Sequence, residues 1–168
     1  MVTKEFNSTN LGLKSNDTVI SSPAPTTGNV DTTPPTANFL FINNDATRIC
    51  YPKSTASLFF GAGDNEGITH YYISGYMTTY YGGNNDVSYG DSIETPSSND
   101  TNWKISGTPY KSFLGYDTYT IYRAGEIPLL GHSTLHVYIW FKDNAGNVSS
   151  PAYDNITYAR GLGPPICN

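Results

Sequence analysis

Acidic and amide side chains gather in two short segments whose composition could bind a metal ion. Asp64 and Glu66 lie in the segment AGDNEG, and Asp143 and Asn144 open the segment DNAGN. Carboxylate and amide oxygens are the ligands that Ca²⁺ prefers, although this spacing does not match an EF-hand loop. Asp and Asn also form turns by hydrogen bonding to their own backbone. We favour structural turns, with calcium as the alternative, and expect no other cofactor.

Histidine, serine and cysteine do not form a recognisable catalytic arrangement. His132 and His136 would lie about 13 Å apart along a strand, which is too far to share one metal ion. The chain contains no Gly-x-Ser-x-Gly segment, and neither of its two cysteines lies beside a histidine in the sequence. We therefore expect that the protein is not an enzyme.

Aromatic side chains are the other candidates for binding, because the chain contains 14 tyrosines and 2 tryptophans. Flat aromatic rings can stack on sugar rings, and clustered tyrosines also form protein interfaces. Four residues in the middle of the chain are candidates for a ligand platform: Tyr80, Tyr81, Tyr89 and Trp103. The alternative is that these rings simply cover the surface of a sheet.

Glycosylation motifs and charge narrow the partners and the location. Asn-x-Ser/Thr motifs occur at Asn7, Asn16, Asn99, Asn147 and Asn155. The net charge of −5 and the lack of basic clusters argue against a nucleic-acid partner. No apolar run approaches the roughly 18 residues of a membrane span. Residues 1–10 are polar and lack the core of a signal peptide, so either a leader has been removed or the chain is an excerpt.

The strongest strand pattern lies in residues 133–149. Four apolar residues alternate with polar or aromatic ones: Leu135, Val137, Ile139 and Phe141. This period of two predicts a strand with one face in a core. The segment DNAGN then forms a turn, and a second strand over about 148–158 completes a long hairpin. Trp140 lies on the opposite face, either exposed or buried under a neighbouring segment.

The same period predicts the remaining strands. They are expected at 36–43, 54–62, 68–77, 103–105 and 116–123, with at most a short strand near 87–89 inside a long loop over 78–101. The strand at 36–43 is apolar on both faces and is expected to be covered on both sides. Seven or so strands without a helix predict a β-sandwich over 34–160, between an extended N-terminal segment, 1–33, and a tail, 161–168.

Cys50 and Cys167 are expected to form a disulfide. Because strands of a sandwich run alternately between its two ends, the loops with Asp64 and Asp143 should emerge at one end. The loop with Cys50 and the C-terminal tail should then lie at the opposite end. The bond would close a loop of more than a hundred residues and would imply an oxidising compartment. Two free thiols, or a bond between chains, are the alternatives.

Several short segments resemble bacterial and archaeal immunoglobulin-like surface modules, of the fibronectin III/Ig-like kind. DNAGN followed by Val-Ser resembles their last hairpin, and DTTPP at 31–35, AGDN at 62–65 and Gly-Ile at 67–68 agree in order over residues 31–158. The resemblance implies an all-β, immunoglobulin-like β-sandwich of about seven or more strands. Such modules are typically extracellular, often tandem and seldom catalytic.

The extended N-terminal segment suggests how such a module could assemble. Leu11, Leu13 and Val19 lie at odd positions, so an extended strand would place them on one face, as a donor strand for a neighbouring subunit. We therefore expect a non-catalytic, extracellular structural module, a subunit of a cell-surface filament, pilus or adhesin assembled head to tail. Its partners would be copies of itself or neighbouring surface domains. The alternative is a carbohydrate-binding accessory module.

Overall fold

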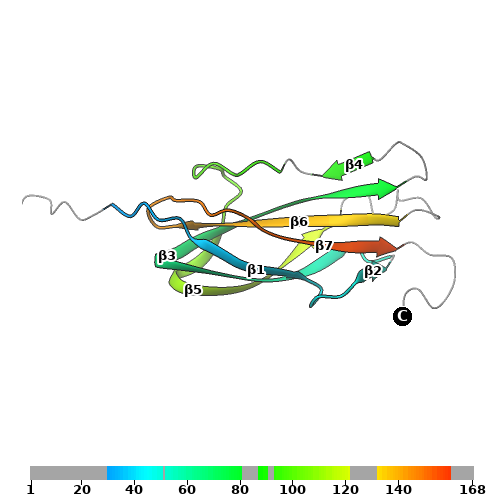
Figure 1. The fold of residues 1–168 in the computed structure, drawn as a ribbon, viewed down its shortest axis with the longest axis horizontal. Helices are drawn as coiled ribbons and strands as arrows, with labels where there is room; N and C mark the ends of the chain where they lie inside the picture. The colour runs from blue at the N-terminus through cyan, green and yellow to red at the C-terminus, as the bar shows by residue number, and fades with distance from the viewer. Residues whose placement is uncertain (1–29, 51, 81–86, 91–92, 122–131, 160–168) are drawn as a thin grey trace, which may run out of the picture. The chain divides into compact units, whose positions relative to one another are not determined.

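The computed structural model describes residues 30–50, 52–80, 87–90, 93–121 and 132–159. Within these residues the expected all-β fold is confirmed, because they form seven strands and no helix. The strands are β1 (Thr36–Ile42), β2 (Arg48–Cys50), β3 (Thr55–Tyr80), β4 (Val87–Gly90), β5 (Lys104–Thr120), β6 (His132–Asp143) and β7 (Ala152–Ala159), as Figure 1 shows. All seven belong to a compact unit that begins at Asp31. The donor-strand candidates Leu11, Leu13 and Val19 lie outside the described residues.

The strand β3 belongs to both layers of the sandwich. Its first part, residues 55–63, pairs with β1 and β5, and its second part, residues 68–80, pairs with β6, with β4 and, over residues 68–71, also with β5. Pairing with β5 shifts register between Gly63 and Ile68, and Gly67 has a φ of 123° that other residues rarely adopt. The two strands expected at 54–62 and 68–77 are therefore one strand of 26 residues that bends between the layers.

The strand order is that of an immunoglobulin-like sandwich. One layer has the order β1-β3-β5, and the other has the order β4-β3-β6-β7-β2. All pairs are antiparallel except β2 and β7, which run parallel. In the immunoglobulin fold, one sheet combines the first, second and fifth strands, and the other is built on the third and the last two. With the short strand β2 left out and the two parts of β3 counted separately, β1, the first part of β3 and β5 are the first, second and fifth strands. The second part of β3, β6 and β7 are then the third and the last two, and this grouping agrees with the expected fold class, an immunoglobulin-like β-sandwich.

The core lies between the two layers. The predicted inward face of β6 is confirmed, because its four residues are at most 1% exposed: Leu135, Val137, Ile139 and Phe141. They share one buried cluster with residues of β1, β3 and β7, among them Ile42, Leu58, Phe60 and Tyr158. The ring of Phe60 lies at the centre of an aromatic group, with ring centroids 5.1–6.2 Å from those of Tyr71, Phe113 and Phe141.

Two other expectations about strands are corrected. The outer face of β1 is not covered, since Phe41 is 39% exposed. The segments expected at 103–105 and 116–123 belong to one strand, β5, which continues through Gly107 and Pro109. Strand β5 is irregular in this part. Gly107 has a φ of 108°, and the pairing of β5 with β3 shifts register between Ile68 and His70. The short strand β2 was not expected, because three residues show no period.

Candidate metal centre and aromatic surfaces

Three carboxylates meet at one end of the sandwich. Asp31 precedes β1, Asp64 lies in the bend of β3, and Asp143 ends β6; one oxygen atom from each lies within 4.8 Å of the others. Ile68 pairs with Asp143, which brings the bend of β3 beside the end of β6. The expectation that the loops of Asp64 and Asp143 emerge at the same end is therefore confirmed. We call these three residues the acidic cluster.

Local hydrogen bonds hold two of these carboxylates in place. Asp64 Oδ2 accepts hydrogen bonds from the backbone N–H groups of Glu66, at 2.9 Å, and Gly67, at 2.6 Å. Asp143 is only 2% exposed. Its Oδ1 accepts from the backbone N–H of Asn147 at 2.9 Å, and its Oδ2 accepts from the Asn147 side-chain amide at 2.7 Å. The predicted turn therefore exists at Asp143, whereas at Asp64 hydrogen bonds of the same kind occur within the bend of β3, and both sets of bonds orient the carboxylates.

Asp31 completes the cluster from a segment distant in the sequence. Its Oδ1 accepts hydrogen bonds from the backbone N–H of Thr33, at 2.9 Å, and from Asn65 Nδ2, at 3.3 Å. The Asn147 amide donates to the backbone carbonyl of Asp31 at 3.0 Å. Two oxygens are left over, because Asp31 Oδ2 and Asp64 Oδ1 are buried and have no hydrogen-bond partner.

The membership of the cluster differs from the candidate calcium ligands proposed from the sequence. Asp64 and Asp143 are brought together, whereas the Glu66 carboxylate is not part of the group, and the side chains of Glu66 and Asn144 are both exposed. Sequence reasoning missed Asp31, because it precedes the first strand and does not lie in a turn between strands. The signal that could have found it is its position shortly before β1, a strand that begins at this same end.

Cys50 lies at the opposite end of the sandwich and is disulfide-bonded. It ends β2, where it pairs with Ala159, the last residue of β7. Ala159 in turn pairs with His132, at the end of β6 distant from Asp143. Cys167, the only other cysteine in the chain, lies outside the described residues, so the Cys50–Cys167 pairing stays a prediction.

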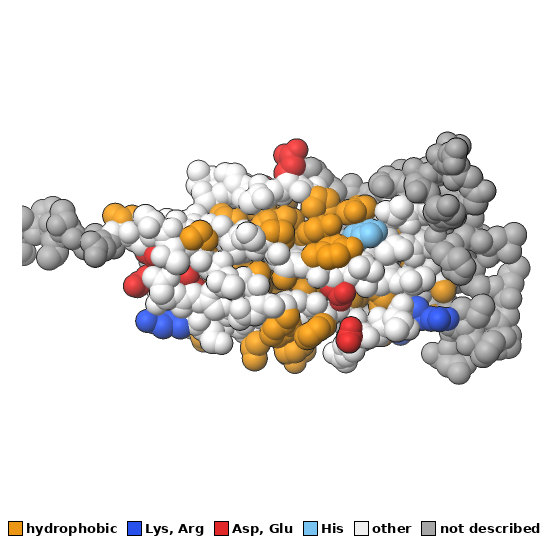
Figure 2. Space-filling model, in the orientation of Figure 1, with side chains coloured by type: hydrophobic (Ala, Val, Ile, Leu, Met, Phe, Trp, Pro, Cys, Tyr) orange, Lys and Arg blue, Asp and Glu red, His pale blue; other side chains and the backbone are white. Residues whose placement is uncertain are grey.

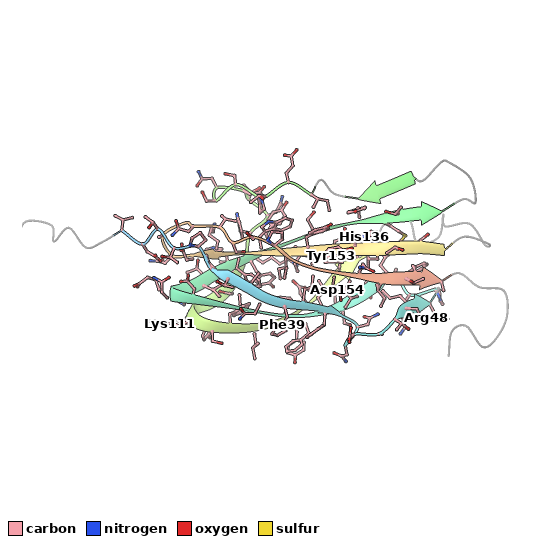
Figure 3. The ribbon with its side chains drawn as sticks, viewed as in Figure 1. Phe39, Arg48, Lys111, His136, Tyr153 and Asp154 are labelled. Carbon is pink, nitrogen blue, oxygen red and sulfur yellow. The ribbon has the colours of Figure 1, made fainter. Side chains whose placement is uncertain are left out.

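One aromatic surface covers the outer face of β3, β6 and β7. Its members form a group that we call the tyrosine row: Tyr76, His136, Tyr138 and Tyr153. The ring centroids of Tyr76 and His136 are 4.5 Å apart, and those of Tyr138 and Tyr153 are 4.7 Å apart. His136 Nδ1 and Tyr153 Oη lie 2.8 Å apart (Figure 3), and partial burial lowers the pKa of His136. Figure 2 shows apolar side chains gathered around this histidine.

The second aromatic surface lies on the outer face of β1, β3 and β5. We call it the phenylalanine face: Phe39, Phe41, Phe59 and Tyr116. Phe59 and Tyr116 stack with their centroids 4.5 Å apart, and Tyr116 is 75% exposed. Phe39 marks this surface in Figure 3. Each layer of the sandwich therefore has a row of partly exposed aromatic rings on its outer side.

Trp103, a candidate platform residue, is largely buried. It is 9% exposed, its Nε1 donates a hydrogen bond to the Ser97 carbonyl at 2.8 Å, and the Lys142 ammonium lies 4.7 Å from its ring centroid. The ring of Tyr72 forms T-shaped contacts with both Trp103 and Trp140. Trp140 is 1% exposed, so of the two alternatives for its face of β6, exposed or buried under a neighbouring segment, it is buried. The side chains of the other candidates, Tyr80, Tyr81 and Tyr89, lie outside the described residues.

The glycosylation candidates differ in accessibility. Asn99 and Asn155 are exposed, whereas Asn7 and Asn16 lie outside the described residues. The amide nitrogen of Asn147, the atom that would carry a glycan, donates hydrogen bonds to Asp31 and Asp143. Glycosylation there would replace one of the two amide hydrogens and break at least one of these contacts, so Asn99 and Asn155 are the better acceptors.

A hollow of about 350 Å³ is lined by five residues of β5: Ser106, Tyr110, Ser112, Phe113 and Leu114. Elsewhere on β5, Asp117 forms an ion pair with Lys104 and accepts a hydrogen bond from Tyr71 Oη. Burial, with the negative charge of Asp117 and the hydrogen bond to it, raises the pKa of Tyr71 to about 12. These contacts join β3 to β5 and serve the fold.

Comparisons with known proteins identify only distant similarities of structure. No family model matches the chain, and no curated protein matches it in sequence. A Niemann-Pick type C2 protein from Japanese carpenter ant aligns over 75% of this chain and 93% of its own, with 11% identity and a TM-score of 0.40. The sporulation control protein Spo0M from Bacillus subtilis aligns over 76% of this chain and 50% of its own, with 10% identity and a TM-score of 0.38. Similarity at this level carries no argument about function.

A search of the described residues finds no helix that is both long and apolar enough to span a membrane.

Proposed function

We propose that the chain is a non-catalytic, extracellular structural module, a subunit of a cell-surface filament, pilus or adhesin that assembles head to tail. One observation carries the proposal: the described chain enters the sandwich at one end and leaves it at the other. Asp31 lies beside Asp64 and Asp143, whereas β7 ends at Ala159, beside Cys50. Modules connected through such ends can follow one another along a single axis.

The disulfide at Cys50 supports an exported location. Disulfides form and persist in oxidising surroundings and are rare in the cytosol. The exposed glycosylation candidates Asn99 and Asn155 are compatible with the same location.

The sandwich also offers an edge for a donor strand. In the described part of the chain, β5 pairs with β3 alone, so one side of this 17-residue strand has no neighbouring strand. An edge of this kind presents N–H and C=O groups to which an extended segment can add. The N-terminal segment of a neighbouring subunit, with Leu11, Leu13 and Val19 on one face, is the proposed donor.

Removal of residues 1–30 should leave a folded monomer that cannot polymerise, because the sandwich itself begins at Asp31. Mass photometry and negative-stain microscopy of unheated protein measure the outcome, with the full chain as the reference that forms filaments. Leu11→Asp with Leu13→Asp should have the same effect. Asn10→Asp with Lys14→Asp, on the opposite face of an extended strand, is the matched control and should polymerise. Normal polymers from the deletion variant, or a purely monomeric full chain, would reject the proposal.

The tyrosine row favours one alternative, a carbohydrate-binding accessory module. Its rings stack side by side, and Tyr153 is 44% exposed, which offers a flat apolar surface to a sugar ring. On this alternative, Tyr153→Ala should weaken retention on the bound polysaccharide by about tenfold, which corresponds to about 1.4 kcal/mol. Tyr116→Ala, on the phenylalanine face, is the control and should change nothing. A glycan array that stays negative with folded protein would exclude the alternative.

A further inference from the structure

We propose that the acidic cluster of Asp31, Asp64 and Asp143 is a calcium-binding site. The proposal does not depend on how the module assembles. One carboxylate oxygen from each residue lies within 4.8 Å of the others. Oxygen ligands on opposite sides of one Ca²⁺ lie about 4.6–5.2 Å apart, because each bond is about 2.3–2.6 Å long. The three oxygens can therefore contact a single ion.

Two buried carboxylate oxygens of the cluster have no hydrogen-bond donor, and a cation would stabilise them. Asp31 Oδ2 and Asp64 Oδ1 each expose less than 1 Å² and have no hydrogen-bond partner. A buried carboxylate oxygen without a donor is costly, and buried polar atoms without partners are rare in native proteins. Among the described residues, no Lys or Arg forms an ion pair with any of the three carboxylates. A cation at their meeting point would supply the missing interaction and would offset their mutual repulsion.

The other oxygens of the cluster are already engaged, and this fixes the direction of the carboxylates. Asp64 Oδ2 accepts two backbone N–H groups, and Asp31 Oδ1 accepts from Thr33 and Asn65. In each of Asp31 and Asp64, one carboxylate oxygen accepts these hydrogen bonds and the other oxygen of the same carboxylate accepts none. The backbone therefore holds each carboxylate with one oxygen bonded and the other free for a ligand.

The donor set selects the type of ion. The group contains only carboxylates and no His or Cys, so it suits a hard cation and not zinc or copper. Asp143 is buried, whereas Asp31 and Asp64 are partly exposed, which leaves room for water to complete the six to eight ligands that Ca²⁺ takes. A bound ion would connect the start of the sandwich, the bend of β3 and the β6–β7 turn.

Calcium alone should therefore bind and stabilise the full chain. After treatment with EGTA and removal of the chelator, isothermal titration calorimetry with CaCl₂ should show one site with a Kd of about 10⁻⁴–10⁻³ M, as in extracellular modules. With 10 mM CaCl₂ the melting temperature should rise by about 5–10 °C, as expected when the ion is well above its Kd. NaCl at matched ionic strength is the control for simple screening.

Asp31→Asn and Asp64→Asn separate a metal site from a merely structural cluster. Each substitution keeps a side-chain acceptor but removes one charge, so it should relieve repulsion in EGTA and abolish binding in calcium. The order of melting temperatures should therefore reverse: the variant is at least as stable as the wild type in EGTA and less stable in CaCl₂. Glu66→Gln removes an exposed charge next to the cluster, and it should bind calcium like the wild type.

Three results would overturn the proposal. The first is the absence of any heat of binding together with equal melting temperatures in EGTA and CaCl₂. The second is a shift of the same size from NaCl at matched ionic strength. The third is undiminished calcium binding by Asp31→Asn and Asp64→Asn.

Discussion

Phe60→Ala should lower the free energy of unfolding by about 3–5 kcal/mol, the cost of deleting a buried aromatic side chain and leaving a cavity. Phe60 is 0% exposed and contacts aromatic rings from β3, β5 and β6. The site cannot collapse easily, because several elements define it. On the β5 side, a Cβ atom added to Gly115 would lie only 2.4 Å from the ring. Urea unfolding monitored by tryptophan fluorescence measures the change.

Phe41→Ala is the matched control, since it removes the same side chain from the outer face of the neighbouring strand. Phe41 is 39% exposed, so its removal loses ring stacking and less buried area than at Phe60 and leaves no closed cavity, and we expect a loss below about 1.5 kcal/mol. If Phe60→Ala does not fold, Phe60→Leu keeps most of the volume and should still lose more stability than Phe41→Ala. Equal losses at the two positions would contradict the assignment of the core.

The double substitution Cys50→Ser with Cys167→Ser should cost about 4–5 kcal/mol, because the bond would close a loop of more than a hundred residues in the unfolded chain. Cys50 is disulfide-bonded and ends β2, a strand of three residues that pairs with the last residues of β7. Guanidinium unfolding with and without a reducing agent measures the effect. The reduced wild type should match the double variant.

A peptide map under non-reducing conditions provides the control for this prediction. It should contain a fragment in which the Cys50 and Cys167 peptides are joined, and that fragment should disappear on reduction. A map without it, or a double variant as stable as the oxidised wild type, would contradict the pairing.

The hairpin around β6 could be predicted from the sequence because its signal is local. Leu135, Val137, Ile139 and Phe141 repeat every second residue, and the structure buries all of them. The same pattern did not predict whether Trp140, on the other face of the strand, is buried. Its cover comes from the ring group of Tyr72 and Trp103, which belongs to other segments of the chain. A period of two identifies the two faces of a strand but not what lies on the outer one.

The bend of β3 shows a second limit. Asp64 forms the hydrogen bonds of a turn with Glu66 and Gly67, so the local chemistry was interpreted correctly. The chain does not reverse there, however, but crosses from one layer to the other within the same strand. Whether a turn reverses the chain depends on which strands accept the segments on either side. That information is not local.

The acidic cluster contains both residues whose positions follow from local sequence and one residue that a distant contact brings in. The sequence places Asp64 and Asp143 in turns, and strand alternation correctly puts those turns at one end. Asp31 joins them through a contact over more than a hundred residues, the hydrogen bond from the Asn147 amide to its carbonyl. No spacing rule connects these positions, and the position of Asp31 before the first strand was the one sequence signal that pointed to this end of the sandwich.

The parallel pairing of β2 with β7 has a mechanical consequence. When the predicted Cys50–Cys167 bond is reduced, a pull on Asp31 reaches β2 through β1, while a pull on the far end of the chain reaches β7 at Ala159. Tension between the two ends of the sandwich therefore acts along these strands and in opposite directions. Their hydrogen bonds are loaded in shear, so they share the force and must break together, whereas a pair that is peeled apart loses its bonds one at a time. The short β2–β7 contact is thus placed to act as a clamp against stretching.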